Sequence, residues 1–215
     1  MYNLPYYKEN DPKVVRAFID QNPFAFVSGC DENNMPVATQ LPVFIEEQNG
    51  KQFLRGHLMK DTDHHKAFLG NPNVLVVFSG HHTYVSGTWY SNPHIASTWN
   101  YMSVHIKGSI RFFEGIQLMD VLRKTSLHFE DNNVESATVL DNLPDEFVNR
   151  VTPFIVGFEI EIQSMDTVFK LSQDRDKLSY LNIIEKLKDK GESGQVIAHE
   201  MEKRFHSLFE KEVQS

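Results

Sequence analysis

The stretch FAFVSGCDENNMPVATQLPVFIEEQNGKQFLRGHLM, residues 24–59, decides the fold. It contains three runs rich in β-branched and aromatic residues, at 24–29, 37–47 and 51–59, and such runs are typical of strands. Polar residues separate the first two runs, and Asn49-Gly50 separates the last two. Asn-Gly between two such runs is the strongest short signal for a β-hairpin. The stretch therefore predicts three consecutive antiparallel strands.

Strand patterns continue beyond this stretch. In NVLVVFSG at 73–80 a continuous apolar run is bounded by turn residues, with Gly80 at its end, as in a strand buried on both faces. The run HTYVSGTWY at 82–90 predicts another strand. Residues 99–114 predict a long strand in which Gly108 marks a bulge or a close backbone approach. The alternation at 154–163 predicts the last strand.

Helical patterns lie at the margins of these strands. We expect helices at 12–22, 62–69, 116–129 and 145–151, and two more after Lys177 that are broken at 191–194. The last helix places Ile197, Met201, Phe205 and Leu208 on one face, which must be covered. Six or seven strands with peripheral helices predict an α+β, mainly β fold, an antiparallel barrel with a C-terminal helical segment.

Length and composition limit the possible classes of protein. The chain has 215 residues, or roughly 1.4 typical domains, so we expect one domain at 1–175 and a helical extension at 176–215 that packs on the barrel or on a dimer partner. A net charge of −8 argues against a broad nucleic-acid surface. The single cysteine, Cys30, excludes a disulfide framework within one chain. No signal-peptide pattern or membrane span is visible, so a soluble, cytoplasmic protein is expected.

Basic side chains gather where the third strand meets the next helix. Such cations, a hydroxyl group and free N–H groups at a helix start are what a phosphate monoester requires. A solvated surface turn is the alternative. The residues concerned are Arg55, Lys60, Thr62, His64, His65 and Lys66.

Several separated motifs carry a resemblance to a known family. They are PVATQLPV at 36–43, RGHLMK at 55–60, HTYVSGTWY at 82–90, STWNYMSVHIKG at 97–108 and FKLSQDR at 169–175. In this order they resemble the PaiB family of FMN-binding negative transcriptional regulators. Lys66-Ala67, Asn71-Pro72 and the run to Phe78 also resemble the FMN-phosphate region of the wider split-barrel flavoprotein superfamily, that of pyridoxamine phosphate oxidase.

The resemblance implies a homodimeric split barrel with FMN at the subunit interface. FMN is expected rather than FAD, since the chain lacks the Gly-x-Gly-x-x-Gly fingerprint of a dinucleotide site. By this resemblance, Thr39, Gln40 and Leu41 should lie along the isoalloxazine edge. Gly56 and His57 should lie where their strand comes close to the cofactor. Gly56 suits this position because a residue without Cβ lets a flat ring come close. The phosphate is assigned to Lys60, Thr62, His65 and Lys66. Trp99, Asn100, Ser103 and His105 complete the expected site, from this protomer or its partner.

Three motifs depart from the family pattern. Asn-Pro-Gln-Trp is expected at 62–65, where this chain has Thr62-Asp63-His64-His65. Gly-Pro-His becomes Gly80-His81-His82, and Ser-Gln-Asn-Arg becomes Ser172-Gln173-Asp174-Arg175. The first departure lies inside the expected phosphate turn.

Three functions remain open at this point. The first is an FMN-binding regulator, for which direct DNA binding is not expected because of the charge and because no helix-turn-helix is evident. The second is a flavin-dependent oxidoreductase with His57 or His105 as the candidate proton donor. The third is an interaction module without a cofactor. Among the 10 histidines, adjacent pairs point to opposite faces of a strand, and we predict no metal site.

Overall fold

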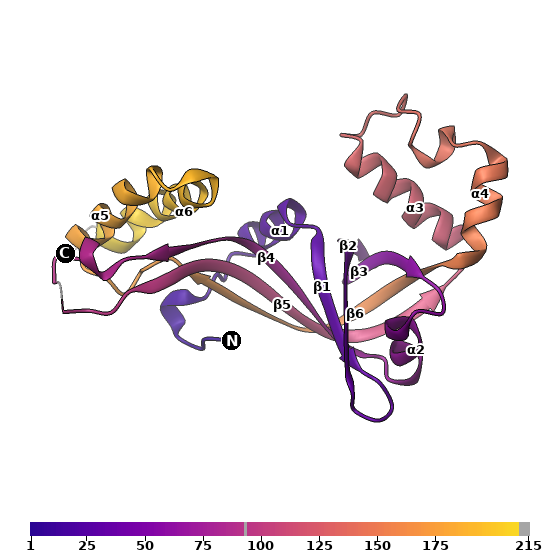
Figure 1. The fold of residues 1–215 in the computed structure, drawn as a ribbon, viewed down its shortest axis with the longest axis horizontal. Coiled ribbons are helices and arrows are strands. Elements are labelled where there is room, and N and C mark those ends of the chain that lie inside the picture. Colours follow the sequence, from indigo (N-terminus) through magenta and orange to yellow (C-terminus); the bar gives the residue numbers. More distant parts are fainter. Residues whose placement is uncertain (93, 211–215) are drawn as a thin grey trace. The chain divides into compact units, whose positions relative to one another are not determined.

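Six strands close into a barrel in the order β1-β2-β3-β6-β5-β4 (Figure 1). The computed structural model describes residues 1–92 and 94–210. The strands are β1 (Phe24–Cys30), β2 (Pro36–Gln48), β3 (Lys51–Met59), β4 (Asn73–Val85), β5 (Thr98–Phe113) and β6 (Ile155–Lys170). The helices are α1 (Pro12–Gln21), α2 (Asp63–Gly70), α3 (Ile116–Phe129), α4 (Asp145–Val151), α5 (Lys177–Lys188) and α6 (Gly191–Phe209). The predicted α+β, mainly β class and the antiparallel barrel are confirmed.

The β2–β3 hairpin forms where Asn-Gly predicts it. Asn49 and Gly50 have φ angles of 53° and 73°, and Gln48 pairs with Lys51 across the turn. Positive φ at both central residues belongs to the tight hairpin turn whose twist matches that of the strands. This turn sets the register that places Val43 opposite Gly56.

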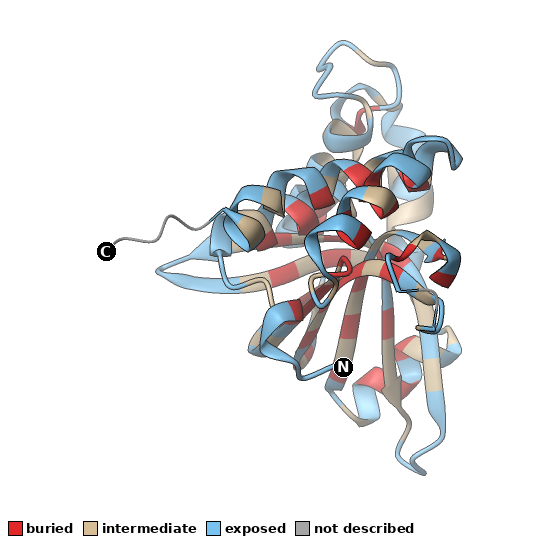
Figure 2. Cartoon of the chain, turned by 90° about the vertical axis from the view of Figure 1, so that its left-hand side faces the viewer, coloured by how far each residue is buried: buried red, intermediate tan, exposed pale blue. Residues whose placement is uncertain are grey.

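Side chains alternate between the two faces of the barrel wall, and Figure 2 shows the alternation as bands of buried and intermediate residues along the strands. On β1, Ala25 and Val27 are 0% and 1% exposed, whereas Phe24 and Phe26 are 60% and 42% exposed. The strand pairing carries this pattern to β2. The inner face forms the core, and the outer face of β1 presents two uncovered aromatic rings.

Strands β4 and β6 extend further than the sequence pattern indicates. Residues 82–85 belong to β4 itself, so the prediction of a separate strand at 82–90 is wrong. Gly80 has no positive φ, and the backbone passes through it without a turn. The prediction for Gly108 is confirmed as a close approach, because a Cβ there would lie 2.4 Å from the carbonyl oxygen of Glu161.

Helices α5 and α6 pack on each other. The Tyr180 hydroxyl donates to the carbonyl of Met201 at 3.0 Å, and Ile183 and Ile197 are fully buried. The break falls at 189–190 rather than at 191–194, which are the first residues of α6. On the predicted apolar face of the last helix, Ile197 and Met201 are buried, whereas Leu208 is 36% exposed.

Contacts divide the chain into two units, each described here by itself. Unit 1 comprises Met1–Val15, Ser79–Val104 and Asp166–Ser215, and unit 2 comprises Arg16–Phe78 and His105–Met165. The boundary at 175 stays a prediction. Within residues 1–92 and 94–210, no helix combines the length and the apolar composition that crossing a membrane requires.

Candidate functional site

The predicted phosphate turn, residues 60–66, joins the end of β3 to the start of α2. Thr62 caps the helix, since its side-chain oxygen accepts a hydrogen bond from the backbone N–H of His65. Asp61 has a φ of 61°, and its N–H donates to Nδ1 of His65 at 3.1 Å. The His65 ring is buried with its edge against Phe112, and this burial lowers its pKa. His65 is therefore a neutral side chain that holds the turn, and Nε2–H is its remaining donor.

Two ammonium groups flank this turn. Lys60 Nζ lies 2.7 Å from the carboxylate of Glu114, and the side chain of Lys66 is exposed. The positive end of the α2 dipole adds to their charge. The Asp63 carboxylate accepts from the N–H of His64 at 2.8 Å, which holds the pKa of Asp63 below its usual value. This donor set fits a phosphate monoester, for which the carboxylates of Asp63 and Glu114 are competitors.

Arg55 is paired with carboxylates outside the phosphate turn, so grouping it with the residues of that turn is wrong. Its Nε donates to Glu159 at 2.6 Å, and Nη1 donates to Glu46 at 3.0 Å. Glu159 is 2% exposed and also accepts from Arg111 at 3.0 and 2.6 Å. Burial alone would raise the pKa of Glu159, but hydrogen bonds from the two arginines outweigh burial and lower it. Arg55 thus ties β3 to β6.

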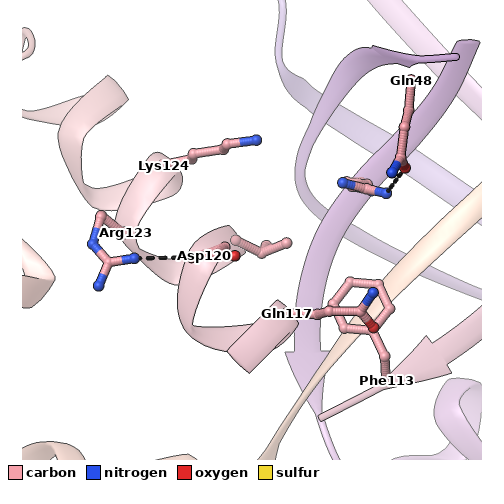
Figure 3. Close-up of a pocket in the computed structure, with 8 residues that line it drawn as sticks. Gln48, Phe113, Gln117, Asp120, Arg123 and Lys124 are labelled. Atoms are coloured by element: carbon pink, nitrogen blue, oxygen red, sulfur yellow. Dashed lines mark hydrogen bonds and ion pairs between the residues drawn. The ribbon is translucent and has the colours of Figure 1, made fainter. Parts of the chain in front are cut away.

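A polar pocket of about 300 Å³ lies beside Arg55 (Figure 3). Arg123 in its wall is paired with Asp120 at 3.0 Å and with Asp141 at 2.7 Å. Lys124 is likewise paired with the carboxylate of Glu46 at 2.8 Å. Among the described residues, this pocket therefore offers no unpaired lysine or arginine to an anion. Its lining consists of Gln48, Arg55, Phe113, Gln117, Asp120, Val121, Arg123 and Lys124.

Residues 39–41 on β2 divide between the two faces of the barrel wall. Gln40 pairs with Phe26 and is exposed on the outer face, whereas Leu41 pairs with buried Ala25 and is 8% exposed. Thr39 pairs with Val27 and points the same way as Leu41. Only Gln40 can therefore offer its side chain to a ligand on the outer face, and Thr39 and Leu41 can offer their backbone groups.

The absence of a Cβ at Gly56 allows neighbouring groups of the barrel to pack closely against its backbone. A Cβ at this position would lie 2.6 Å from Cζ of Phe158 and 2.6 Å from the carbonyl oxygen of Pro42. The space that a flat ring was expected to use is thus filled by a side chain of this chain. The next residue, His57, lines a second, apolar pocket, and its buried Nδ1 has no hydrogen-bond partner in the described chain.

The expected site residues on β5 fall in both units. Trp99, Asn100 and Ser103 belong to unit 1, and His105 belongs to unit 2. Asn100 is fully buried, and its amide oxygen accepts from Ser172 Oγ at 2.9 Å. Trp99 is 53% exposed and therefore has surface to offer to a ligand or partner.

Unit 1 contains a pair that the sequence did not single out as a site. The guanidinium carbon of Arg175 lies 4.8 Å from the ring centre of Tyr90. The Tyr90 hydroxyl and Arg175 Nε are buried, and neither has a hydrogen-bond partner within the described residues. The motif at 169–175 was the only sequence signal for Arg175. For possible metal ligands, the described part of the chain contains no suitable group of three or more His, Cys, Asp or Glu side chains.

Comparison with protein families gives one match over most of the chain. The model described as "Putative FMN-binding domain" matches residues 1–164. A curated relative, "Protease synthase and sporulation protein PAI 2" of Bacillus subtilis, is 30% identical over 189 residues, which cover 88% of this chain and 90% of the relative. An uncharacterised protein of Emericella nidulans is 22% identical and covers 95% of this chain and 97% of its own.

Solved structures share the fold at low sequence identity. The flavocytochrome Anf3 of Azotobacter vinelandii superposes with a TM-score of 0.56 at 17% identity, covering 79% of this chain and 72% of its own. A Bacteroides thetaiotaomicron protein described as a "putative 5-nitroimidazole antibiotic resistance protein" gives a TM-score of 0.52 at 16% identity, covering 74% of this chain and 84% of its own. These similarities show the split-barrel fold.

Proposed function

Because the chain belongs to the FMN-binding domain family and FMN is its cofactor, we propose that it acts as a PaiB-like negative regulator of gene expression. The observation that carries this proposal is the 30% identity over 88% of the chain to the Bacillus subtilis protein named for protease synthesis and sporulation. When bound, FMN supplies a group that can accept and donate electrons. The chain's own residues bind and orient it.

The phosphate is assigned to the turn at 60–66. Lys60 and Lys66 supply charge, Thr62 shapes the helix start, and His65 offers Nε2–H. The isoalloxazine edge is assigned to the side chain of Gln40 and to the backbone groups of its neighbours. Trp99, Asn100, Ser103 and His105 remain proposed contacts, either from this protomer or from its partner, and so do Gly56 and His57 through their backbone groups.

A homodimer with the flavin at its interface is part of the proposal. Phe24 and Phe26 are 60% and 42% exposed on the outer face of β1, where Phe26 is paired with Gln40. Exposed aromatic side chains beside polar groups are typical of protein interfaces. A two-fold axis would bury this face against the same face of a second copy.

Regulation is proposed to act through a protein partner or indirectly. The net charge is −8, and most lysines and arginines of α5 and α6 are paired with carboxylates within unit 1. Lys188 lies 2.7 Å from Glu185, Lys203 lies 2.6 Å from Glu200, and Arg204 lies 2.6 Å from Glu200 as well. Few cations remain there to release counterions from DNA.

Complementation tests the regulatory role. The chain is expressed in a Bacillus subtilis strain that lacks PAI 2, and transcripts are compared with those of the parent strain and of an empty-vector control. We expect the chain to lower again the transcripts that rise in the deletion strain. A folded, abundant chain that changes none of these transcripts sinks the proposal. A parallel gel shift is expected to show no specific DNA binding tighter than about micromolar.

The second candidate is a flavin-dependent oxidoreductase, which the redox cofactor itself favours. Anaerobic mixing of the FMN-loaded protein with NADH or NADPH separates the two candidates. Bleaching of the flavin band within seconds favours an enzyme. A flavin that stays oxidised favours a regulator.

A further inference from the structure

His64 lies in the phosphate turn at the start of α2 (Figure 1), but it is not among the residues assigned to the phosphate. Its side chain is 15% exposed. Nδ1 of its ring lies 3.0 Å from Oδ1 of Asp63, and Nε2 lies 3.0 Å from Oγ1 of Thr62. Both ring nitrogens therefore have partners within the turn.

Only a protonated His64 ring can complete the hydrogen bonds around it. The Asp63 carboxylate accepts hydrogen bonds but cannot donate them, so Nδ1 of His64 must carry a hydrogen. The Thr62 hydroxyl has one hydrogen, which it donates to the carbonyl of Met59 at 3.1 Å. The hydrogen between Thr62 and His64 must then come from Nε2. A ring with hydrogens on both nitrogens is the imidazolium cation, and a neutral ring would leave one of these contacts without a hydrogen.

Without a proton on His64, the charged side chains of the turn sum to one negative charge. They comprise three carboxylates and two ammonium groups, and the neighbouring His65 is neutral. One net negative charge opposes the binding of a phosphate dianion, and a protonated His64 would offset it. The charged residues are Lys60, Asp61, Asp63, Lys66 and Glu114.

The elements that pack near α2 place their charges elsewhere. Strand β1 carries no charged side chain, and in the turn after it Glu32 lies beside Gly70, at the other end of α2. Strand β2 has its two glutamates at its hairpin end, beyond the residues that pair with β1. Strand β5 presents Phe112 to the His65 ring, while its Arg111 is paired with Glu159. The charged groups that the structure places around His64 are therefore those of the turn.

We propose that protonation of His64 strengthens FMN binding at this turn, so that the affinity for FMN rises as the pH falls from 8 to 6. Histidine is the side chain whose charge ordinarily changes in this range. His64 acts as a positioning residue, because its cation offsets the Asp63 carboxylate and its Nε2–H fixes the hydroxyl group of Thr62. The inference rests on the proposed assignment of the FMN phosphate to this turn.

The test compares the Kd for FMN of the native chain and of His64→Gln at pH 6, 7 and 8, by quenching of flavin fluorescence. Glutamine can hydrogen-bond but cannot carry a charge, and the family pattern has glutamine at this position. The FMN phosphate itself loses charge near about pH 6, and the ratio of the two Kd values removes this common effect. We expect His64→Gln to bind within about twofold of the native chain at pH 8 and about fivefold more weakly at pH 6, which is the range of a partly exposed ion pair.

A ratio that does not rise as the pH falls overturns the proposal. The control is His199→Gln, because His199 is exposed on α6 and is not among the proposed FMN contacts. This variant should match the native Kd at every pH. An equal change in both variants would show that the effect is not specific to the turn, and it also overturns the proposal.

A double variant tests whether His64 acts by offsetting Asp63. Asp63→Asn combined with His64→Gln removes the carboxylate and the titrating ring together. It should bind FMN as the native chain does at pH 6, and up to about fivefold more tightly than the native chain at pH 8. A double variant as weak as His64→Gln at pH 6 contradicts this role.

Proton uptake tests the inference on the native chain, without dependence on the folding of a variant. Titration calorimetry at pH 7 in two buffers of different ionisation enthalpy counts the protons that accompany FMN binding. We expect the native chain to take up a fraction of a proton, and His64→Gln to take up less. Release of protons, or no exchange in the native chain, overturns the proposal.

Lys66→Ala separates the inference from the assignment on which it rests. An unchanged Kd in Lys66→Ala would mean that the phosphate binds elsewhere, and the inference would fail with the assignment. A weaker Kd in Lys66→Ala together with a flat His64→Gln ratio would leave the phosphate at the turn and overturn only the role of His64.

Discussion

Lys60 and Glu114 form an ion pair, with Nζ 2.7 Å from the carboxylate, at the turn that we assign to the FMN phosphate. The Lys60 side chain is 21% exposed and that of Glu114 is 65% exposed. The Glu114 carboxylate is paired with the Lys60 ammonium group, which would otherwise be available to pair with the phosphate. Binding of FMN is therefore expected to compete with this pair.

Replacing Glu114 should strengthen FMN binding. In Glu114→Gln the Kd for FMN should fall by about two- to fivefold, since partly exposed ion pairs are worth up to about 1 kcal/mol. Quenching of flavin fluorescence during titration measures the Kd. Glu146→Gln makes the same charge change at an exposed position on α4. Equal Kd values for the two variants would remove Lys60 from the phosphate site.

Removing Lys66 should weaken FMN binding. A lost charged hydrogen bond is worth about 1.5–3 kcal/mol, so the Kd of Lys66→Ala should rise about 10- to 150-fold. The same fluorescence titration applies. Lys13→Ala is the control, because Lys13 is exposed on helix α1 and is not among the proposed FMN contacts. An unchanged Kd in Lys66→Ala excludes this residue from the site.

The outer face of β1 is expected to form the dimer interface. Light scattering at micromolar concentration should report about twice 24.9 kDa for the native chain and a monomer for Phe26→Lys, because burying a lysine at an interface is costly. Met35→Lys, on the exposed β1–β2 turn, should remain dimeric. A native monomer that still binds FMN would contradict the interface.

The buried carboxylate of Glu159 should make stability depend on pH. Its pKa in the folded chain is below the usual 4.5, so its contribution is complete above that pH and is lost as pH falls through the folded value. Glu159→Gln should lower the free energy of unfolding by about 3–5 kcal/mol at pH 7 and by less at acid pH. Urea unfolding measures both. Glu161→Gln, exposed on the same strand, should change little.

Much of the fold could be read from local sequence. Asn49-Gly50 predicted the β2–β3 hairpin, and helical spacing predicted α3 at 116–129 and α4 at 145–151, as the structure has them. These features depend on backbone preferences within a few residues. The prediction of a separate strand at 82–90 is wrong because Gly80 was interpreted as the end of a strand, whereas β4 continues through it to Val85.

The residue types at the candidate site came from the sequence by itself, and their roles came only from the tertiary structure. The turn at 60–66 was recognisable from its cations and its helix start. The sequence did not show that Arg55 forms an ion pair with Glu159, which lies 104 residues away along the chain. Nor could the sequence show that Phe158 fills the space beside Gly56, or that Nδ1 of His57 is buried without a partner. Local pattern determines which groups are present, whereas burial and pairing between distant segments decide which of them remain free for a ligand.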